Sequence, residues 1–178
     1  MSGLNVLLLI VIALTPGDYA PPEGIELTWQ AALAGEDEPG ERMIVSGTVF
    51  AADGKTAIKG AVVYAYHTDV RGYYSAEERG PSNPRLKGWM KTGGDGRYEL
   101  SSVRPGPYPE GNIAAHVHFF VTPPGRKEQL FELLFEGDPL LPDDIEERAN
   151  RGGYYLLQAL ERDDGGVWRC TADIVLRP

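Results

Sequence analysis

The chain contains few of the residues that covalent cross-links, nucleic-acid contacts or membrane spans require. Among its 178 residues there is one cysteine, Cys170, expected to be a core thiol, so no disulfide can form within the chain. Lysine and arginine number 17 against 26 aspartate and glutamate residues, which gives a net charge of −9. Nucleic acids and anionic membranes bind basic surfaces, so this balance argues against both as partners.

Long apolar runs are also missing, since the stretch from Val6 to Leu14 has only nine residues and is too short to span a bilayer. It suits the apolar core of a secretion signal, although no lysine or arginine precedes it. Val11-Ile-Ala13 is an acceptable cleavage site, whereas Asp18-Tyr-Ala20 is a poor one that would leave proline first. We therefore expect residues 1–20 to be a signal peptide or leader of an exported, periplasmic or extracellular protein. The alternative is a buried terminal strand in a cytoplasmic protein.

Helical periodicity is scarce, and turn residues are plentiful, with 22 glycines and 14 prolines. Frequent turns favour short strands over long helices. The β-rich runs lack βαβ alternation and predict an all-β fold, a single antiparallel β-sandwich domain with short helical or irregular insertions. These runs are residues 43–50, 61–67, 97–102, 114–121, 130–135, 154–160 and 167–176. The domain should occupy residues 43–178, after an N-terminal extension at 21–42.

Two short helices are predicted within this β-rich pattern. The first follows Pro142, with Asp143 or Asp144 as its N-cap, acids in its first turn and a Gly-Gly stop at 152–153. The second is predicted for residues 25–34. A glycine-rich stretch at 93–96 is a hairpin signal.

Two of the three histidines lie one residue apart in an apolar run typical of a strand. Successive strand residues point to opposite faces, so His116 and His118 should share one face and Val117 the other. A Pro-Gly-Pro turn should place Tyr108 beside this strand, because each proline fixes φ and glycine permits a chain reversal. The first hypothesis is a metal site with tyrosine and histidine ligands. A solvated strand face or a hydrogen-bonded core pair would give the same His-x-His pattern.

Further short motifs surround this pair in a characteristic order. They are Ser46-Gly-Thr-Val, Gly60-Ala-Val-Val-Tyr-Ala-Tyr-His-Thr-Asp69, Gly72-Tyr-Tyr-Ser75, Lys87-Gly-Trp-Met-Lys-Thr92, Asp95-Gly-Arg-Tyr98, Arg104-Pro-Gly-Pro-Tyr-Pro109, Ala115-His-Val-His-Phe119, Phe135-Glu-Gly-Asp-Pro-Leu140 and Asp173-Ile-Val-Leu176. No single motif is specific, but the ordered set is. From about residue 43 to its end, the chain resembles the intradiol ring-cleavage dioxygenases, the protocatechuate and catechol dioxygenase family.

The resemblance implies a ferric ion, Fe(III), held by two tyrosinates and two histidines, which correspond here to Tyr74, Tyr108, His116 and His118. A bound metal favours the deprotonated form of its ligands, so phenols with a free pKa of about 10 can bind it as phenolates. The resemblance also implies that a catechol-type substrate displaces Tyr108, which then serves as a catalytic base, and that dioxygen cleaves the ring between its two hydroxylated carbons. The family pattern Gly-x-Tyr selects Tyr74, and strand alternation would send Tyr73 to the other face.

Two positions depart from the family pattern. Ile113 stands where well-studied members carry an arginine that stabilises charge on the ring. Glu132 stands where glutamine is common, and its negative charge would oppose catecholate binding if it pointed inward. Losing one positioned electrostatic donor costs about two to three powers of ten in rate. Arg71, Arg85 or Arg97 could compensate from another direction.

Three functions therefore stay open. The first is an intradiol dioxygenase that acts on a small catechol-type aromatic. The second is a catalytically impaired, iron-binding relic, with Ile113 and Glu132 marking the lost activity. The third is a non-enzymatic binding module of the transthyretin-like or carboxypeptidase-regulatory type, whose strand and turn motifs are similar. His67 could be a further ligand or a supporting residue, and the chain could form a homo-oligomer.

Overall fold

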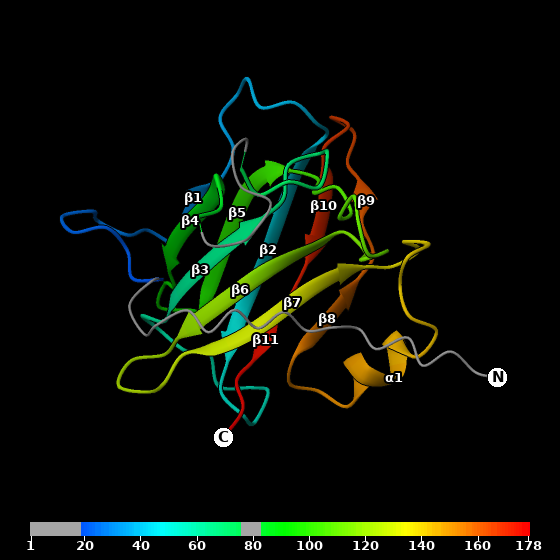
Figure 1. Cartoon of the computed structure of the whole chain (residues 1–178). Coiled ribbons are helices and arrows are strands. Elements are labelled where there is room, and N and C mark those ends of the chain that lie inside the picture. Colours follow the sequence, from blue (N-terminus) through cyan, green and yellow to red (C-terminus); the bar gives the residue numbers. More distant parts are fainter. Residues whose placement is uncertain (1–18, 76–82) are drawn as a thin grey trace.

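Residues 19–75 and 83–178, which the computed structural model describes, form two β-sheets that pack face to face (Figure 1). The six-stranded sheet contains, in spatial order, β1 (Gln30–Ala32), β5 (Arg97–Val103), β2 (Arg42–Phe50), β10 (Trp168–Thr171) and β9 (Glu161–Arg162), and β11 (Ile174–Val175) also pairs with β2. The five-stranded sheet contains β4 (Leu86–Lys91), β3 (Val62–His67), β6 (His116–Thr122), β7 (Gln129–Phe135) and β8 (Tyr155–Gln158). The predicted β-sandwich is confirmed.

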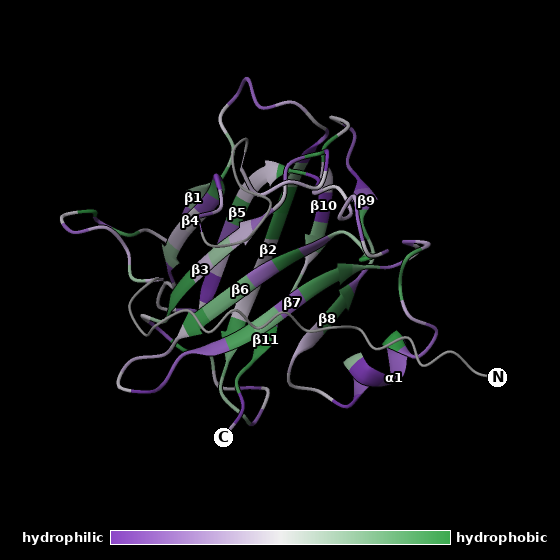
Figure 2. Cartoon of the chain, viewed as in Figure 1, coloured by the Kyte–Doolittle hydropathy of each residue, from purple (hydrophilic) through white to green (hydrophobic). Residues whose placement is uncertain are grey.

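The core lies between the two sheets and follows from alternation along their strands. In β2 every second residue is buried, and Met43 and Val45 have no exposed surface. Phe119 from β6 and Leu133 from β7 face them from the other sheet, and both strands carry hydrophobic stretches (Figure 2). Burying each such side chain contributes about 1.5–3 kcal/mol. Cys170 is buried in the same core, and this burial raises the pKa of its thiol to about 12.

The antiparallel strand pairs are β2 with β5, β3 with β4 and β6, β6 with β7, and β9 with β10. The pairs of β1 with β5, β2 with β10 and β11, and β7 with β8 are parallel. Both sheets are therefore mixed. Hydrophobic alternation sets which face a strand buries but does not set the direction of its neighbour.

The helix predicted for residues 25–34 is wrong, because part of this segment is strand β1. Its backbone bonds to the edge of β5 instead of to itself: Leu33 N donates to Ser101 O at 2.9 Å, and Glu99 N donates to Trp29 O at 2.9 Å. Pairing with an open sheet edge overrides a weak local helix propensity. Part of the predicted N-terminal extension thus belongs to the sheet.

Two other local predictions have mixed outcomes. The short helix is present as α1 (Ile145–Asn150), with Asp144 at its N-cap, although no side-chain cap hydrogen bond is formed. The stretch at 93–96 is a turn, but it is not a hairpin, since it joins β4 in one sheet to β5 in the other. A glycine-rich turn signals chain reversal without indicating which sheet receives the next strand.

The predicted leader at 1–20 lies outside the described residues except for its last two positions. Tyr19 packs on the outer face of the five-stranded sheet, where its ring stacks on Phe120 with centroids 3.8 Å apart. Its carbonyl oxygen accepts a hydrogen bond from Trp89 Nε1 at 2.7 Å. Within the part of the chain that the structure describes, no helix is long and apolar enough to cross a membrane.

Candidate metal centre

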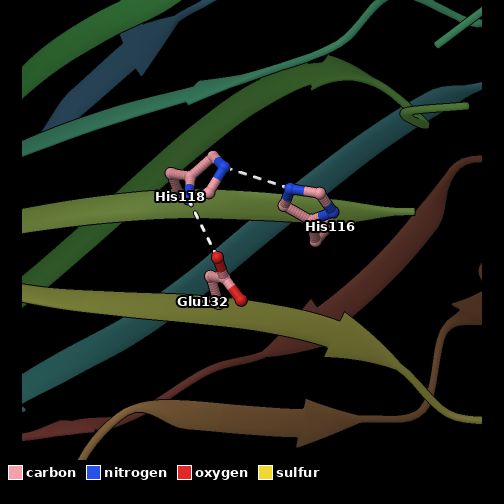
Figure 3. A group of neighbouring side chains, drawn as sticks. All are labelled: His116, His118 and Glu132. Atoms are coloured by element: carbon pink, nitrogen blue, oxygen red, sulfur yellow. Dashed lines mark hydrogen bonds and ion pairs between the residues drawn. The ribbon is translucent and has the colours of Figure 1, made fainter. Parts of the chain in front are cut away.

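Strand β6 brings two imidazoles to one face of the five-stranded sheet. His116 and His118 point outward, and Val117 between them is fully buried in the core, as strand alternation predicts. The Nε2 atoms of the two histidines lie 3.0 Å apart (Figure 3). The two rings are perpendicular, with an interplanar angle of 89°, and their Nε2 atoms approach each other.

Two tyrosines from separate loops complete this cluster. Tyr74 follows β3, and its hydroxyl lies 3.1 Å from His118 Nε2. Tyr108 follows β5, and its hydroxyl lies 3.3 Å from His116 Nε2. The two hydroxyl groups also contact each other directly. The structure therefore brings together all four residues that the family resemblance identified, although 44 positions separate Tyr74 from His118.

Asp69 joins the two loops that carry the tyrosines. Its backbone oxygen accepts hydrogen bonds from Gly72 N at 3.0 Å and from Gly106 N at 2.9 Å, one in each loop. Its carboxylate accepts from the backbone of Arg71 at 2.9 Å and of Tyr73 at 3.1 Å. Burial alone would raise the pKa of this carboxyl, but these bonds and the Arg71 guanidinium lower it below its usual value. The sequence motif ended on Asp69, but nothing in its local pattern indicated this role.

Two glycines allow the tyrosine loops to approach so closely. A Cβ on Gly72, which has a φ of +85°, would lie 1.9 Å from Pro107 O. A Cβ on Gly106 would lie 2.4 Å from Val70 O. Gly106 does not adopt a positive φ. Glycine at position 106 in the Pro-Gly-Pro turn thus permits close contact with the backbone of the other loop. It is not needed for the chain reversal that the sequence suggested.

Tyr73 does not join the cluster. Its backbone groups bond to Asp69, and its ring lies beside the Arg71 guanidinium, 5.7 Å from ring centroid to Cζ. The segment from 69 to 75 contains turns and bends but no strand, so strand alternation is not what separates Tyr73 from Tyr74. The two side chains are separated by the turn that Asp69 closes.

The orientation of His116 depends on groups at its other ring nitrogen. Because a carbonyl oxygen can only accept, His116 Nδ1 donates to Ala114 O, at 2.7 Å, which leaves Nε2 unprotonated in the neutral ring. The Asp138 carboxylate accepts from Ala115 N at 3.0 Å and from Leu140 N at 2.9 Å, so it holds the chain just before His116. The Gly-Asp-Pro motif contained this aspartate, but sequence reasoning assigned it no role.

Burial disfavours the charged forms of both tyrosines and of His118 in the absence of a cation. It raises the pKa of Tyr108 to about 12 and raises that of Tyr74 well above its usual value, with the neighbouring tyrosine adding to the effect on Tyr74. Burial, together with His116 and His67, lowers the pKa of His118 well below its usual value. Tyr66 stacks on the His118 ring with centroids 4.7 Å apart and covers its side.

The four groups are better arranged to bind a metal ion than to form hydrogen bonds with one another. They form a closed ring of four contacts: phenol to phenol, Tyr108 to His116, His116 to His118, and His118 to Tyr74. With both imidazoles neutral and the His116 hydrogen on Nδ1, at most three hydrogens are available for these contacts. Lone pairs would therefore face each other across at least one. A cation removes that repulsion and stabilises the phenolates that burial disfavours, so the donor set suits a hard ion such as Fe(III).

His67 lies outside this cluster. Its ring is fully buried, with Nδ1 2.6 Å from Thr68 O and Nε2 2.7 Å from the Ser102 hydroxyl on β5. It therefore links the two sheets, and the hypothesis of a further histidine ligand is wrong. In β3 it pairs with Val117, the core-facing neighbour of the two clustered histidines.

The three arginines that could replace the missing family arginine have other positions. Arg71 forms an ion pair with Asp69 at 2.8 Å. Arg85 pairs with Glu38 and lies 3.8 Å from the Asp69 carboxylate. Arg97 is on β5 in the other sheet, beside a surface groove. Compensation by these arginines is thus not supported.

The fold and the cluster together define a β-sandwich protein with a tyrosine- and histidine-lined candidate metal centre. A sequence model of the family described as "Dioxygenase" matches residues 18–178. The chain belongs to this family, the intradiol ring-cleavage dioxygenases, and the resemblance noted in its motifs is confirmed.

The chain aligns with only part of the length of its curated relatives. Catechol 1,2-dioxygenase 1 of Acinetobacter lwoffii is 36% identical over 127 residues, which are 61% of this chain and 40% of the relative. Chlorocatechol 1,2-dioxygenase of Rhodococcus opacus is 35% identical over 126 residues, 61% of this chain and 49% of the relative. The chain thus spans about half the length, or less, of these relatives.

Solved structures give the same fold over more of the chain. The dioxygenase domain of a dioxygenase carbohydrate-binding protein fusion from Streptomyces sp. SirexAA-E has a TM-score of 0.64 and 25% identity, and the match covers 92% of this chain and 95% of that domain. Chlorocatechol 1,2-dioxygenase from Pseudomonas putida has a TM-score of 0.65 and 26% identity, with 90% and 70% coverage.

Proposed function

We propose that this protein is a non-haem ferric dioxygenase that cleaves the ring of a small catechol-type aromatic between its two hydroxylated carbons, with dioxygen as the second substrate. The observation that carries this proposal is the convergence of two phenol oxygens and two imidazole nitrogens, which form a closed ring of contacts with too few hydrogens to satisfy all of them. The names of the relatives, catechol and chlorocatechol 1,2-dioxygenases, support the substrate class.

Tyr74, Tyr108, His116 and His118 would hold the iron. When bound, ferric iron would draw electron density from the catecholate and so prepare the ring for reaction with dioxygen. A metal site explains the convergence of these four donors better than a non-enzymatic binding module does, because such a module does not require them.

Tyr108 is the ligand best placed to exchange with substrate. Its ring is less buried than that of Tyr74, which has 2% of its surface exposed. Because burial raises the pKa of free Tyr108 to about 12, its released phenolate would be a strong base, able to accept a substrate hydroxyl proton at Oη.

An iron-binding relic is the second candidate. It is favoured by Ile113, whose side chain offers no positive charge, and by the ion pairs that hold Arg71 and Arg85 elsewhere. Loss of one electrostatic donor lowers a rate by about two to three powers of ten without abolishing metal binding. The proposed dioxygenase should therefore be slow but active, whereas a relic should bind iron and catechol without turnover.

The experiment is a visible spectrum with iron analysis, then anaerobic addition of catechol, then oxygen. We expect a red-brown tyrosinate-to-iron band that shifts with catechol and a muconate-type product once oxygen enters. Tyr74→Phe should abolish or blue-shift the band, and His118→Ala should remove iron, whereas the adjacent Tyr73→Phe should change neither. Full iron content with an unchanged spectrum in Tyr74→Phe would contradict the ligand assignment. A protein that stays colourless after ferric reconstitution would favour the binding module.

We also propose that the protein is exported, on the basis of the apolar run from Val6 to Leu14. The contacts of Tyr19 with Phe120 and Trp89 make this residue part of the folded domain. A leader peptide would therefore end before Tyr19, which agrees with cleavage after Ala13.

A further inference from the structure

Glu132 lies directly opposite His118 in the antiparallel pair of β6 and β7. Its Oε1 is 3.4 Å from His118 Nδ1, the ring nitrogen that faces away from the tyrosines. Both side chains are largely buried, with 13% of His118 and 14% of Glu132 exposed. Figure 3 shows that the contacts of His118 with Glu132 and with His116 leave from different ring nitrogens.

His118 Nδ1 has no shorter polar contact among the described residues. It is shielded from solvent and has no hydrogen-bond partner in the structure, and the Glu132 carboxylate, 3.4 Å away, is the acceptor group that faces it. The alternative placement of the hydrogen, on Nε2, would turn the Nδ1 lone pair toward a carboxylate and would also occupy the nitrogen that faces Tyr74 and His116. Both effects are unfavourable.

We propose that Glu132 is the positioning residue of His118: its carboxylate accepts the Nδ1 hydrogen and so directs the Nε2 lone pair into the four-donor cluster. This inference rests on the proposed function, since it treats His118 as an iron ligand. A carboxylate behind a ligating histidine fixes the tautomer and raises the basicity of the nitrogen that binds metal. His116 obtains the same orientation from a neutral carbonyl group, Ala114 O.

The carboxylate is itself held in place. At the start of the neighbouring strand, the Tyr154 carbonyl accepts a hydrogen bond from Glu132 N at 2.9 Å. Burial raises the pKa of Tyr154, and the negative charge of Glu132 and a hydrogen bond between the two side chains raise it further. Tyr154 therefore donates its hydroxyl hydrogen to the carboxylate. Glu132 also adds to the raised pKa of Tyr74 and Tyr108, after burial, so its charge acts across the cluster.

The departure from the family glutamine thereby acquires a function. A carboxylate that pointed at the substrate would oppose catecholate binding, but this one contacts the back of His118. It makes His118 a stronger donor than glutamine would, and it places an extra negative charge behind the iron ligands. Both effects stabilise a trivalent ion in this centre.

The test compares Glu132→Gln, which keeps the shape and removes the charge, with Glu136→Gln, which removes a charge from an exposed position just after β7. In iron-loaded protein, Glu132→Gln should move the tyrosinate-to-iron band to longer wavelength, because a weaker donor leaves the ion more electron-poor. It should also weaken iron binding by about 10- to 100-fold, measured by competition with a chelator. Glu136→Gln should match the wild type in both.

A second measurement needs no metal. In the metal-free protein, nitrogen NMR of the His118 ring should show hydrogen on Nδ1 in the wild type and in Glu136→Gln, and a larger share on Nε2 in Glu132→Gln. Hydrogen on Nε2 in the wild type would overturn the inference, as would an unshifted band with unchanged iron affinity. Loss of all iron in Glu132→Gln, as expected for His118→Ala, would make Glu132 a direct ligand and also overturn it. A wild type that shows the Nδ1 tautomer but never binds iron would contradict the proposed function alone.

Discussion

The buried His67 should make the stability of this protein depend on pH in a way that can be measured. Its ring has no exposed surface, and its two nitrogens are satisfied by Thr68 O at 2.6 Å and by the Ser102 hydroxyl at 2.7 Å. The carbonyl can only accept, so Nδ1 carries the hydrogen and Ser102 donates to Nε2. Burial lowers the pKa of His67 from 6.5 to about 4, with smaller contributions from its neighbours.

The direction and size of the effect follow from this difference in pKa. Between the two values the unfolded chain binds a proton that the folded chain does not, so stability falls as pH falls. The contribution is complete above the unfolded value of 6.5, decreases as the pH falls, and is lost near pH 4. A difference of about 2.5 pKa units corresponds to about 3 kcal/mol.

The assay is denaturant unfolding of the metal-free protein at several pH values between about 7.5 and about 4, where His67 is expected to act. Carboxylates contribute to the wild-type profile, so the informative quantity is the difference from His67→Gln, which keeps a donor and an acceptor but does not titrate. The wild type should lose about 3 kcal/mol more than this variant over the range. Ser102→Ala should be less stable than the wild type but keep its pH dependence. Parallel profiles for the wild type and His67→Gln would refute the reasoning.

Two further predictions concern the loops and the N-terminus. Gly72→Ala should destabilise the protein by about 3 kcal/mol or more and reduce its iron content, because the new Cβ would lie 1.9 Å from Pro107 O at a φ of +85°. Gly125→Ala, with a φ of +69° and no atom within 4 Å, should cost only about 1–2 kcal/mol, and equal losses in unfolding experiments would disprove the loop contact. For the exported protein, mass spectrometry should find a mature N-terminus that retains Tyr19, whose ring stacks on Phe120 at 3.8 Å. A mature chain that begins at Pro21 would contradict this.

The local sequence pattern was sufficient to predict those features that depend on a single strand or a single motif. Alternation predicted β2 and the common direction of His116 and His118, because side-chain direction in a strand depends only on position along it. Strand β4 was missed because Gly88 and two lysines interrupt its apolar pattern. Glycine is needed at position 88 because of a residue from the other sheet. A Cβ on Gly88 would lie 2.9 Å from the side chain of Leu33, which follows β1.

The same limit applies to the site. The motifs identified Tyr74 and Tyr108, but the hydrogen bond from Gly106 N to Asp69 O, which joins their loops, connects residues about 37 positions apart, and no local pattern indicates such a contact. The sequence raised the question of which way Glu132 points. Only the register of β6 against β7, which pairs it with His118, answers that question.

The sequence by itself determined the β-rich class, the family and the identity of the four converging residues, because these depend on composition, strand periodicity and motif order. The tertiary structure alone decided the parallel strand pairs, the inter-sheet position of His67 and the contact between Glu132 and the back of His118. Each of these depends on which distant segment pairs with which strand. That choice reflects the packing of the whole core, and no stretch of the chain contains it.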